Sequence, residues 1–367
     1  MHYSYGTMKS NVRPIRVGLI GYGFAGRTFH APLIRSVEGM TLGVVGSTQL
    51  DAVAAAIPEA VVCAPDAVPT HPDVDLVVIA TPNQSHFPLA AAALRAGKDV
   101  VIDKPFTLDL AEARELAAIA KRHNRLLSVF HNRRWDSEIL ATQAVLASGV
   151  LGQIVHYECH MDRFRPNIRK RWREDPGPGA GLWFDLGPHL IDQALYLFGL
   201  PHSVRASFAT LRPGGQTEDW AHIQLDYHGL RVILHATLLA AGGAPRTLMH
   251  GTRASWMKHG IDTQEQQLIA GMLPTDPAFG IDPNPGILID GATGQRTEII
   301  APRGHQQTYY AEIRDALLHK QPPSLSARDA IAVMAILETT FQAATTGTVL
   351  PLPLTPSELA DWEQTQG

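Results

Sequence analysis

Residues 15–30 read "IRVGLIGYGFAGRTFH" and decide the fold of the first half of this chain. An apolar run of strand length ends there in a G-x-G-x-x-G pattern formed by Gly21, Gly23 and Gly26. These glycines let the backbone turn tightly and approach a pyrophosphate, whose charge the free N–H groups of the next helix would bind. A strand before the pattern and a helix after it are typical of a dinucleotide site. A glycine turn without a ligand is the alternative.

The same loop supplies three further residues that we assign to the cofactor, namely Tyr22, Phe24 and Ala25. Pro32 lies in the helix expected to follow the loop. Because proline has no N–H and its ring clashes with the preceding turn, Pro32 should kink or shorten that helix.

Apolar runs alternate with helical patterns from this stretch as far as residue 130. The runs are "IRVGLI", "TLGVVGS", "AVVC", "DLVVIA", "KDVVID" and "RLLSVF". Continuous apolar strands indicate burial on both faces, as in a parallel sheet covered by helices. We predict a doubly wound α/β domain over residues 1–130, with the first dozen residues as a loose tail.

The pattern changes over residues 131–367, which we treat as a second domain. A short helix, "SEILATQAVLASG", precedes strands of alternating polarity such as "IVHYECHMD" and "AHIQLDYHG". Alternation favours an open, mainly antiparallel sheet with one solvated face. Residues 262–303 show little periodicity, and "QQTYYAEIRDALLHK" and "SARDAIAVMAILETTFQAATTG" are helical patterns. We expect these last helices to pack across the second domain.

Composition limits the kind of partner. The 367 residues carry a net charge of −4 at pH 7, which gives no field to gather nucleic acid or anionic membrane, so a small molecule is expected. Cys63 and Cys159 are far apart and form no disulfide framework or zinc motif, which favours a reducing cytoplasm. We expect neither a signal peptide nor a membrane span.

The residues that select between NAD and NADP are expected near the end of the second apolar run. NAD-binding chains place an Asp or Glu there, and this chain has Gly46, Ser47 and Thr48. The two hydroxyls and the guanidinium of Arg27 could bind a 2′-phosphate, so we favour NADP, with NAD as the second choice. Ser47 and Thr48 could also cap the next helix.

Further candidates follow the ends of the next two apolar runs, where ligands bind in such sheets. Thr81, Pro82 and Asn83 form a loop whose amide could hold a ribose or carboxamide, or could be only a turn and helix cap. Asp103 and Lys104 follow the next run. A lysine beside an oxidised nicotinamide suits proton transfer near neutral pH, although a solvated surface lysine is the alternative.

The stretch "GAGLWFDLGPHLIDQAL" at residues 179–195 brings an Asp and a His close together. Asp185 and His189 share a helix face if the helix extends back to 185, and Pro188 suits a first turn. With Lys104 they make an acid/base set. The alternative is an Asp N-cap followed by a His.

Two features of the second domain remain open. The strand "HYECHMD" places His156, Glu158, His160 and Asp162 on one face, where substrate contact or a subunit interface is favoured and no metal is assigned. The basic run at residues 163–174 is either an anion site or a solvated loop over the cleft.

Taken in order, these motifs resemble the Gfo/Idh/MocA oxidoreductases, especially their NADP-dependent scyllo-inositol dehydrogenases. The resemblance rests on "GYGFAGRTFHAPLI", "ATPNQSH", "DKPFTLDLAEA", "FHNRRWD", "DRFRPNIRKRWRE" and "GLWFDLGPHLIDQAL", and covers about residues 14–350. It implies a Rossmann domain, an α/β domain with an open antiparallel sheet, and Lys104, Asp185 and His189 as the catalytic set. Asp103 departs from the family's usual Glu.

The expected activity is hydride transfer between a nicotinamide and a polyol, inositol or sugar carbon. We also assign His86, Asn132, Trp172 and Arg173 to the cofactor, and Asp162 and Arg163, with the catalytic set, to the substrate. A non-catalytic sensor on the same fold is the alternative, but a sensor has no need of an acid/base set. We expect a homodimer or higher homo-oligomer.

Overall fold

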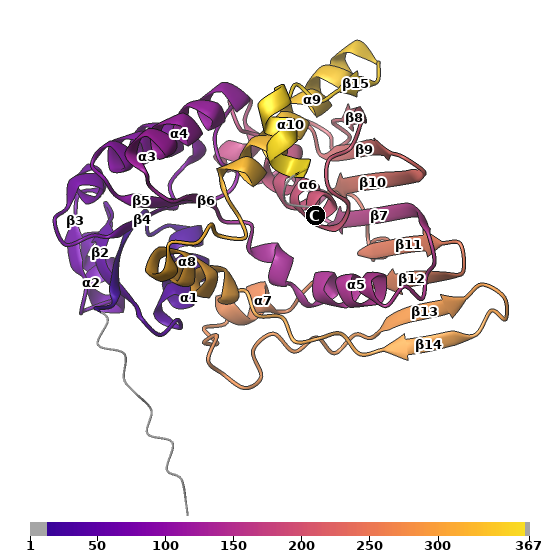
Figure 1. The fold of residues 1–367 in the computed structure, drawn as a ribbon, viewed down its shortest axis with the longest axis horizontal. Helices are drawn as coiled ribbons and strands as arrows, with labels where there is room; N and C mark the ends of the chain where they lie inside the picture. Colours follow the sequence, from indigo (N-terminus) through magenta and orange to yellow (C-terminus); the bar gives the residue numbers. More distant parts are fainter. Residues whose placement is uncertain (1–12, 364–367) are drawn as a thin grey trace, which may run out of the picture.

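A computed structural model describes residues 13–363 as two sheets with helices packed on them (Figure 1). The predicted loose tail over the first dozen residues lies outside the described residues. Strands β1 to β6 build the first sheet and strands β7 to β15 the second. The predicted combination of a Rossmann sheet with a mainly antiparallel second sheet is confirmed.

The first sheet has six parallel strands in the order β3-β2-β1-β4-β5-β6. They are β1 (Ile15–Ile20), β2 (Met40–Gly46), β3 (Val61–Cys63), β4 (Leu76–Ile79), β5 (Asp99–Ile102) and β6 (Leu127–Val129). The helices between them are α1 (Ala31–Arg35), α2 (Leu50–Ala56), α3 (His86–Arg95) and α4 (Leu110–His123). The order reverses beside β1, and sheets of this kind bind their ligands at the carboxyl ends of the strands at such a reversal.

Pro32 alters the helix that follows the glycine loop, as expected. The residues 26–30 before α1 form a π-helical segment, η1 (Gly26–His30), and Pro32 lies in the first turn of α1. The π-helical turn thus gives way to the α-helix next to the proline, which has no N–H to donate.

The second sheet has nine strands in the order β14-β13-β12-β11-β7-β10-β9-β8-β15. They are β7 (Ile154–Asp162), β8 (Ser203–Ala209), β9 (Trp220–Tyr227), β10 (Leu230–Thr237), β11 (Thr247–Gly251), β12 (Ala254–Lys258), β13 (Gly286–Asp290), β14 (Arg296–Ile299) and β15 (Leu350–Pro351). Strands β7 and β10 pair in parallel, and the other pairs are antiparallel. The hairpin β13–β14 lies in the segment for which little periodicity was noted.

Helices cover one face of this sheet. They include α5 (Ser137–Ala147), which contacts β12, α6 (Leu182–Phe198), which contacts β7 and β10, and α9 (Ala327–Thr346), which contacts β8. Along β7, Cys159 faces Gln193 of α6 and Tyr157 packs on Phe198. Residues 156, 158, 160 and 162 therefore point to the opposite face, where their side chains are part-exposed.

The last helices follow only in part the expectation that they pack across the second domain. Helix α8 (Thr308–His319) packs on the Rossmann domain, because Tyr309 bonds Ser128 and Tyr310 bonds His30. Helix α9 contacts α4 and β6 as well as α6 and β8, so it joins the two domains (Figure 1). The remaining helices are α7 (Gln264–Ile269) and α10 (Pro356–Glu363).

Candidate active site

The glycine loop has the geometry that a dinucleotide requires. Gly21 has φ +96°, and a Cβ there would lie 2.5 Å from the carbonyl oxygen of Ala80. A Cβ at Gly26 would clash with the carbonyl oxygen of Gly21, whereas nothing lies within 4 Å of a Cβ at Gly23. The first glycine thus allows the turn, the third allows close helix packing, and the second leaves open space for a pyrophosphate. The three glycines therefore fit a bound dinucleotide.

The residues expected to select the cofactor lie beside this loop. Gly21 N–H donates to the carbonyl of Gly46 at 2.8 Å, which places the end of β2 next to the loop. Ser47 is buried, and its hydroxyl accepts a hydrogen bond from Gln49 N–H at 3.0 Å. Thr48 is exposed. The expectation that these hydroxyls cap the next helix is wrong, because Gln49 is the N-cap residue of α2.

The predicted catalytic residues meet between the two domains. Lys104 follows β5, and its Nζ donates to Oδ1 of Asp185 at 3.0 Å and to the Asp185 carbonyl at 2.7 Å. Burial alone would raise the pKa of Asp185, but Lys104, Arg173 and Arg163 outweigh it and hold that pKa well below its usual range. Asp185 is therefore ionised and pairs with Lys104, and the imidazole is not its partner.

Helix α6 begins earlier than expected. It begins at Leu182 after Gly181, whose φ of 93° supplies the entry. Asp185 is consequently inside the first turn and shares a face with His189, so the alternative of an Asp N-cap is wrong. The expectation that Pro188 lies in the first turn is also wrong, because it lies inside the helix.

His189 is buried, with 6% of its surface exposed, and its Nδ1 has no hydrogen-bond partner in the described part of the chain. Burial, followed by the charges of Lys104 and Arg133, lowers the pKa of His189 well below 6.5. The ring is therefore neutral near pH 7 and can accept a proton.

A cavity of about 260 Å³ opens at this point. Its lining includes the catalytic set and the predicted residues Phe24, Ala25, Asp103, Asn132, Arg163 and Arg173. The loop after β7 adds Arg165, Arg169 and Arg171. Burial and the neighbouring arginines lower the pKa of Arg165 to about 10, which indicates positive charge without enough anions to balance it. The basic run thus faces the cavity, as an anion site requires.

Three residues predicted to touch the cofactor have other contacts. His86 is buried between the carbonyls of Pro105 and Thr81, each 2.9 Å from a ring nitrogen, so it holds two loops together. Asn83 donates to the carbonyl of Gly179 at 3.4 Å. Trp172 is 40% exposed, and its ring lies under the guanidinium of Arg173.

The prediction that Asp162 binds substrate is not supported by its position. The period of two along β7 places Asp162 on the sheet face away from α6, with His160. It does not line the cavity that holds His189. Tyr22, Thr81 and Pro82 likewise lie outside that lining.

Sequence reasoning missed two lining residues that form an ion pair. Arg133 donates to Glu265 at 2.6 Å, and both residues also border an adjacent cavity of about 590 Å³. Arg133 lies in the stretch "HNRRW" directly after the last Rossmann strand. A position at the end of a strand could have indicated a site residue. Glu265 lies in the segment without periodicity, where no pattern marks it.

A Rossmann sheet with an open glycine loop, and an acid/base set in the adjoining cleft, define a nicotinamide-dependent oxidoreductase. Residues 15–131 match the oxidoreductase family described by its NAD-binding Rossmann fold, and residues 143–354 match that family's C-terminal alpha/beta domain. The chain belongs to the Gfo/Idh/MocA oxidoreductase family. The alternative of a non-catalytic sensor is not retained.

Named relatives and solved structures agree with this assignment. The chain is 49% identical over 333 residues to the uncharacterized oxidoreductase YdgJ of Escherichia coli, covering 90% of this chain and 96% of that protein. It is 34% identical over 339 residues to the scyllo-inositol 2-dehydrogenase (NADP(+)) IolW of Bacillus subtilis, covering 91% and 95%. A crystal structure of a putative oxidoreductase from Klebsiella pneumoniae is 48% identical, with TM-score 0.91 and coverage of 97% and 100%.

Within residues 13–363, no helix combines the length and the apolar character that crossing a membrane requires.

Proposed function

We propose that this protein is an NADP-dependent dehydrogenase that moves a hydride between the nicotinamide and a polyol, inositol or sugar carbon. The observation that carries the proposal is the meeting of Lys104, Asp185 and His189 in one cavity beside the open glycine loop. A neutral buried imidazole and a fixed ammonium are the two groups that oxidation of a secondary alcohol needs.

The roles follow from geometry and charge. The bound nicotinamide supplies the hydride acceptor or donor. His189 takes the proton from the substrate hydroxyl during oxidation and returns it during reduction. Its ring borders the cavity, and because Nδ1 is buried, we assign the proton transfer to Nε2. Lys104 donates to the same substrate oxygen, and Asp185 holds the ammonium in place at 3.0 Å.

Support for NADP comes from the end of β2. Gly46, Ser47 and Thr48 present no carboxylate that would repel a 2′-phosphate. The relative IolW, which is 34% identical, is named as an NADP(+) enzyme. The arginines at the cavity also favour substrates with an anionic group, so sugar acids belong among the candidates.

A spectrophotometric screen tests the proposal. Inositols, aldoses and sugar acids are each offered with NADP and with NAD, and nicotinamide reduction is followed. We expect turnover of at least one of these compounds, with a higher kcat/KM for NADP. Binding of NADP without turnover of any compound in the three classes would contradict the proposal.

A further inference from the structure

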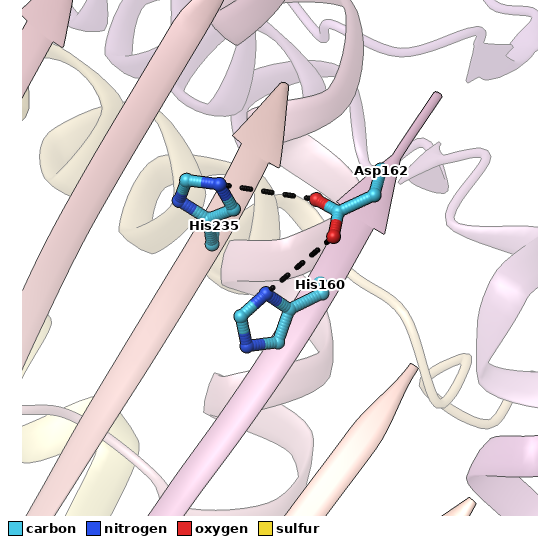
Figure 2. Close-up of side chains that lie close together, drawn as sticks. All are labelled: His160, Asp162 and His235. Carbon is cyan, nitrogen blue, oxygen red and sulfur yellow. Dashed lines mark ion pairs between the residues drawn. The ribbon is translucent and has the colours of Figure 1, made fainter. Parts of the chain in front are cut away.

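We propose a binding site for a divalent transition metal, with Zn²⁺ as the best-matched ion, on the sheet face opposite α6. Its ligands are His160 and Asp162 of β7 and His235 of β10 (Figure 2). One ligand atom from each residue lies within 4.8 Å of the other two. The site is separate from the catalytic cavity, whose lining contains none of the three residues.

Strand geometry brings these side chains together. His160 and Asp162 are two residues apart and therefore point to the same face of the sheet. Strands β7 and β10 pair in parallel, with His235 in register with His160 and Thr237 with Asp162. Three neighbouring positions on one face of the sheet thus bring two imidazoles and a carboxylate close together.

The facing atoms have no protein partner that would explain their arrangement. Within the described residues, His160 Nδ1 and Asp162 Oδ1 are buried and make no hydrogen bond. The carboxylate lies 3.9 Å from His160 Nδ1 and 3.9 Å from His235 Nε2, which is too long for a hydrogen bond. Asp162 is only 8% exposed, so water does not solvate it freely. A cation between these atoms would compensate the buried lone pairs and the carboxylate charge.

Outer contacts orient two of the three ligands, His160 and Asp162. Glu158 Oε2 lies 2.8 Å from His160 Nε2. When that nitrogen carries the proton, Nδ1 keeps the lone pair that a metal needs. The Ala244 N–H donates to Asp162 Oδ2 at 3.0 Å, which leaves Oδ1 free. A carboxylate behind a ligating histidine is the usual support of a zinc site.

Two imidazoles and one carboxylate form a donor set that zinc accepts, with water completing four-coordination. Bound metal would join β7 to β10 and stabilise the folded state, because the unfolded chain does not preform the site. This role does not involve the substrate or the nicotinamide.

The test measures metal binding by the full-length protein, freed of any affinity tag and treated with chelator. Calorimetry with Zn²⁺ and the visible spectrum with Co²⁺ should each report about one ion per chain. Zn²⁺ should also raise the melting temperature. His235→Ala and Asp162→Asn should abolish all three signals, and Glu158→Gln should weaken binding by about 10–100-fold.

His250→Ala is the matched control, because His250 is on a neighbouring strand and its Nδ1 contacts Ser255. It should bind zinc as the unsubstituted protein does. Absence of stoichiometric binding by the unsubstituted protein would overturn the proposal, whatever the variants do. Equal zinc binding in His235→Ala, or equal loss in His250→Ala, would also overturn it. Circular dichroism of each variant shows whether a loss of zinc binding is caused by misfolding. If a variant is misfolded, zinc binding by the unsubstituted protein decides whether the proposal stands.

Discussion

The chemistry of the proposed active site depends on the opposite charge states of two neighbouring side chains. Asp185 is ionised because Lys104 and two arginines offset the effect of its burial. His189, one turn later in α6, is neutral because burial and the same lysine oppose its protonation. An ionised carboxylate that fixes the ammonium and a neutral imidazole that accepts a proton are different tasks, and their environments separate them.

This separation predicts the pH profile of alcohol oxidation. The base must be unprotonated, so kcat/KM should fall as pH drops through the pKa of His189 in the free enzyme. Because that pKa is lowered from 6.5, the acid limb should lie below pH 6.5 and the rate should stay level from there to neutrality. Initial rates in buffers of constant ionic strength check this. An acid limb centred above pH 7 would contradict it.

A single substitution should shift the preference from NADP towards NAD. The Ser47→Asp substitution puts a carboxylate where a 2′-phosphate is expected, and an aspartate can keep the hydrogen bond that Ser47 accepts from Gln49 N–H. The NADP/NAD ratio of kcat/KM should fall by about tenfold or more, which corresponds to about 1.4 kcal/mol. Kinetics with both cofactors measure the ratio. An unchanged ratio, or a better kcat/KM with NAD in the unsubstituted protein, would contradict the NADP proposal.

At the scale of elements, different glycines of the loop serve folding and cofactor binding. A methyl group at Gly26 would strike the backbone carbonyl of Gly21, whereas a methyl group at Gly23 would meet nothing in the protein. Gly26→Ala should therefore lower the free energy of unfolding by about 1–3 kcal/mol, as overpacking does. Gly23→Ala should leave stability unchanged and weaken NADP binding by about tenfold or more, because the methyl group occupies the pyrophosphate space.

Denaturant unfolding and NADP titration of both variants measure these effects. The two substitutions add the same group three residues apart, so each serves as the control for the other. Unchanged NADP affinity in Gly23→Ala would show that the open space is not the pyrophosphate site.

The elements that follow a regular period could be predicted from the sequence. Continuous apolar runs marked the Rossmann strands, and alternation placed His160 and Asp162 on one face of β7. The start of α6 could not be predicted, because it depends on the positive φ of Gly181. The position of Asp162 does not support its assignment to the substrate for a similar reason, since alternation does not say which face α6 will cover. The destination of α8 depends on tertiary contacts of Tyr309 and Tyr310, which no local pattern contains.

At the scale of the whole molecule, buried ion pairs join helices α6 and α9 to the segment that follows the last Rossmann strand. Arg134, at the domain junction, bonds Asp192 of α6 at 2.7 Å and Asp329 of α9 at 3.2 Å, with all three side chains buried. Helix α9 also contacts α4 and β6 of the Rossmann domain, so this ion-paired unit packs on that domain. The distance between Lys104 and His189, which come from different domains, depends on that packing.

The part-exposed face of the second sheet leads to a prediction about assembly. Its mixed polar and apolar side chains suit an isologous contact between two copies of the chain. We predict a homodimer or higher homo-oligomer. Light scattering at micromolar concentration should report at least twice the chain mass of 39.9 kDa. A particle of the single-chain mass would contradict this prediction.

In the proposed reaction, His189 exchanges the proton while the glycine loop holds the dinucleotide. The most direct measurement is kcat of His189→Ala, with the NADP dissociation constant measured on the same sample and the exposed His228→Ala as control. We expect kcat of His189→Ala to fall by about 10²–10⁴ and its NADP affinity to stay within a few-fold. His228→Ala should be unaffected. Turnover of His189→Ala close to that of the unsubstituted protein would contradict the account.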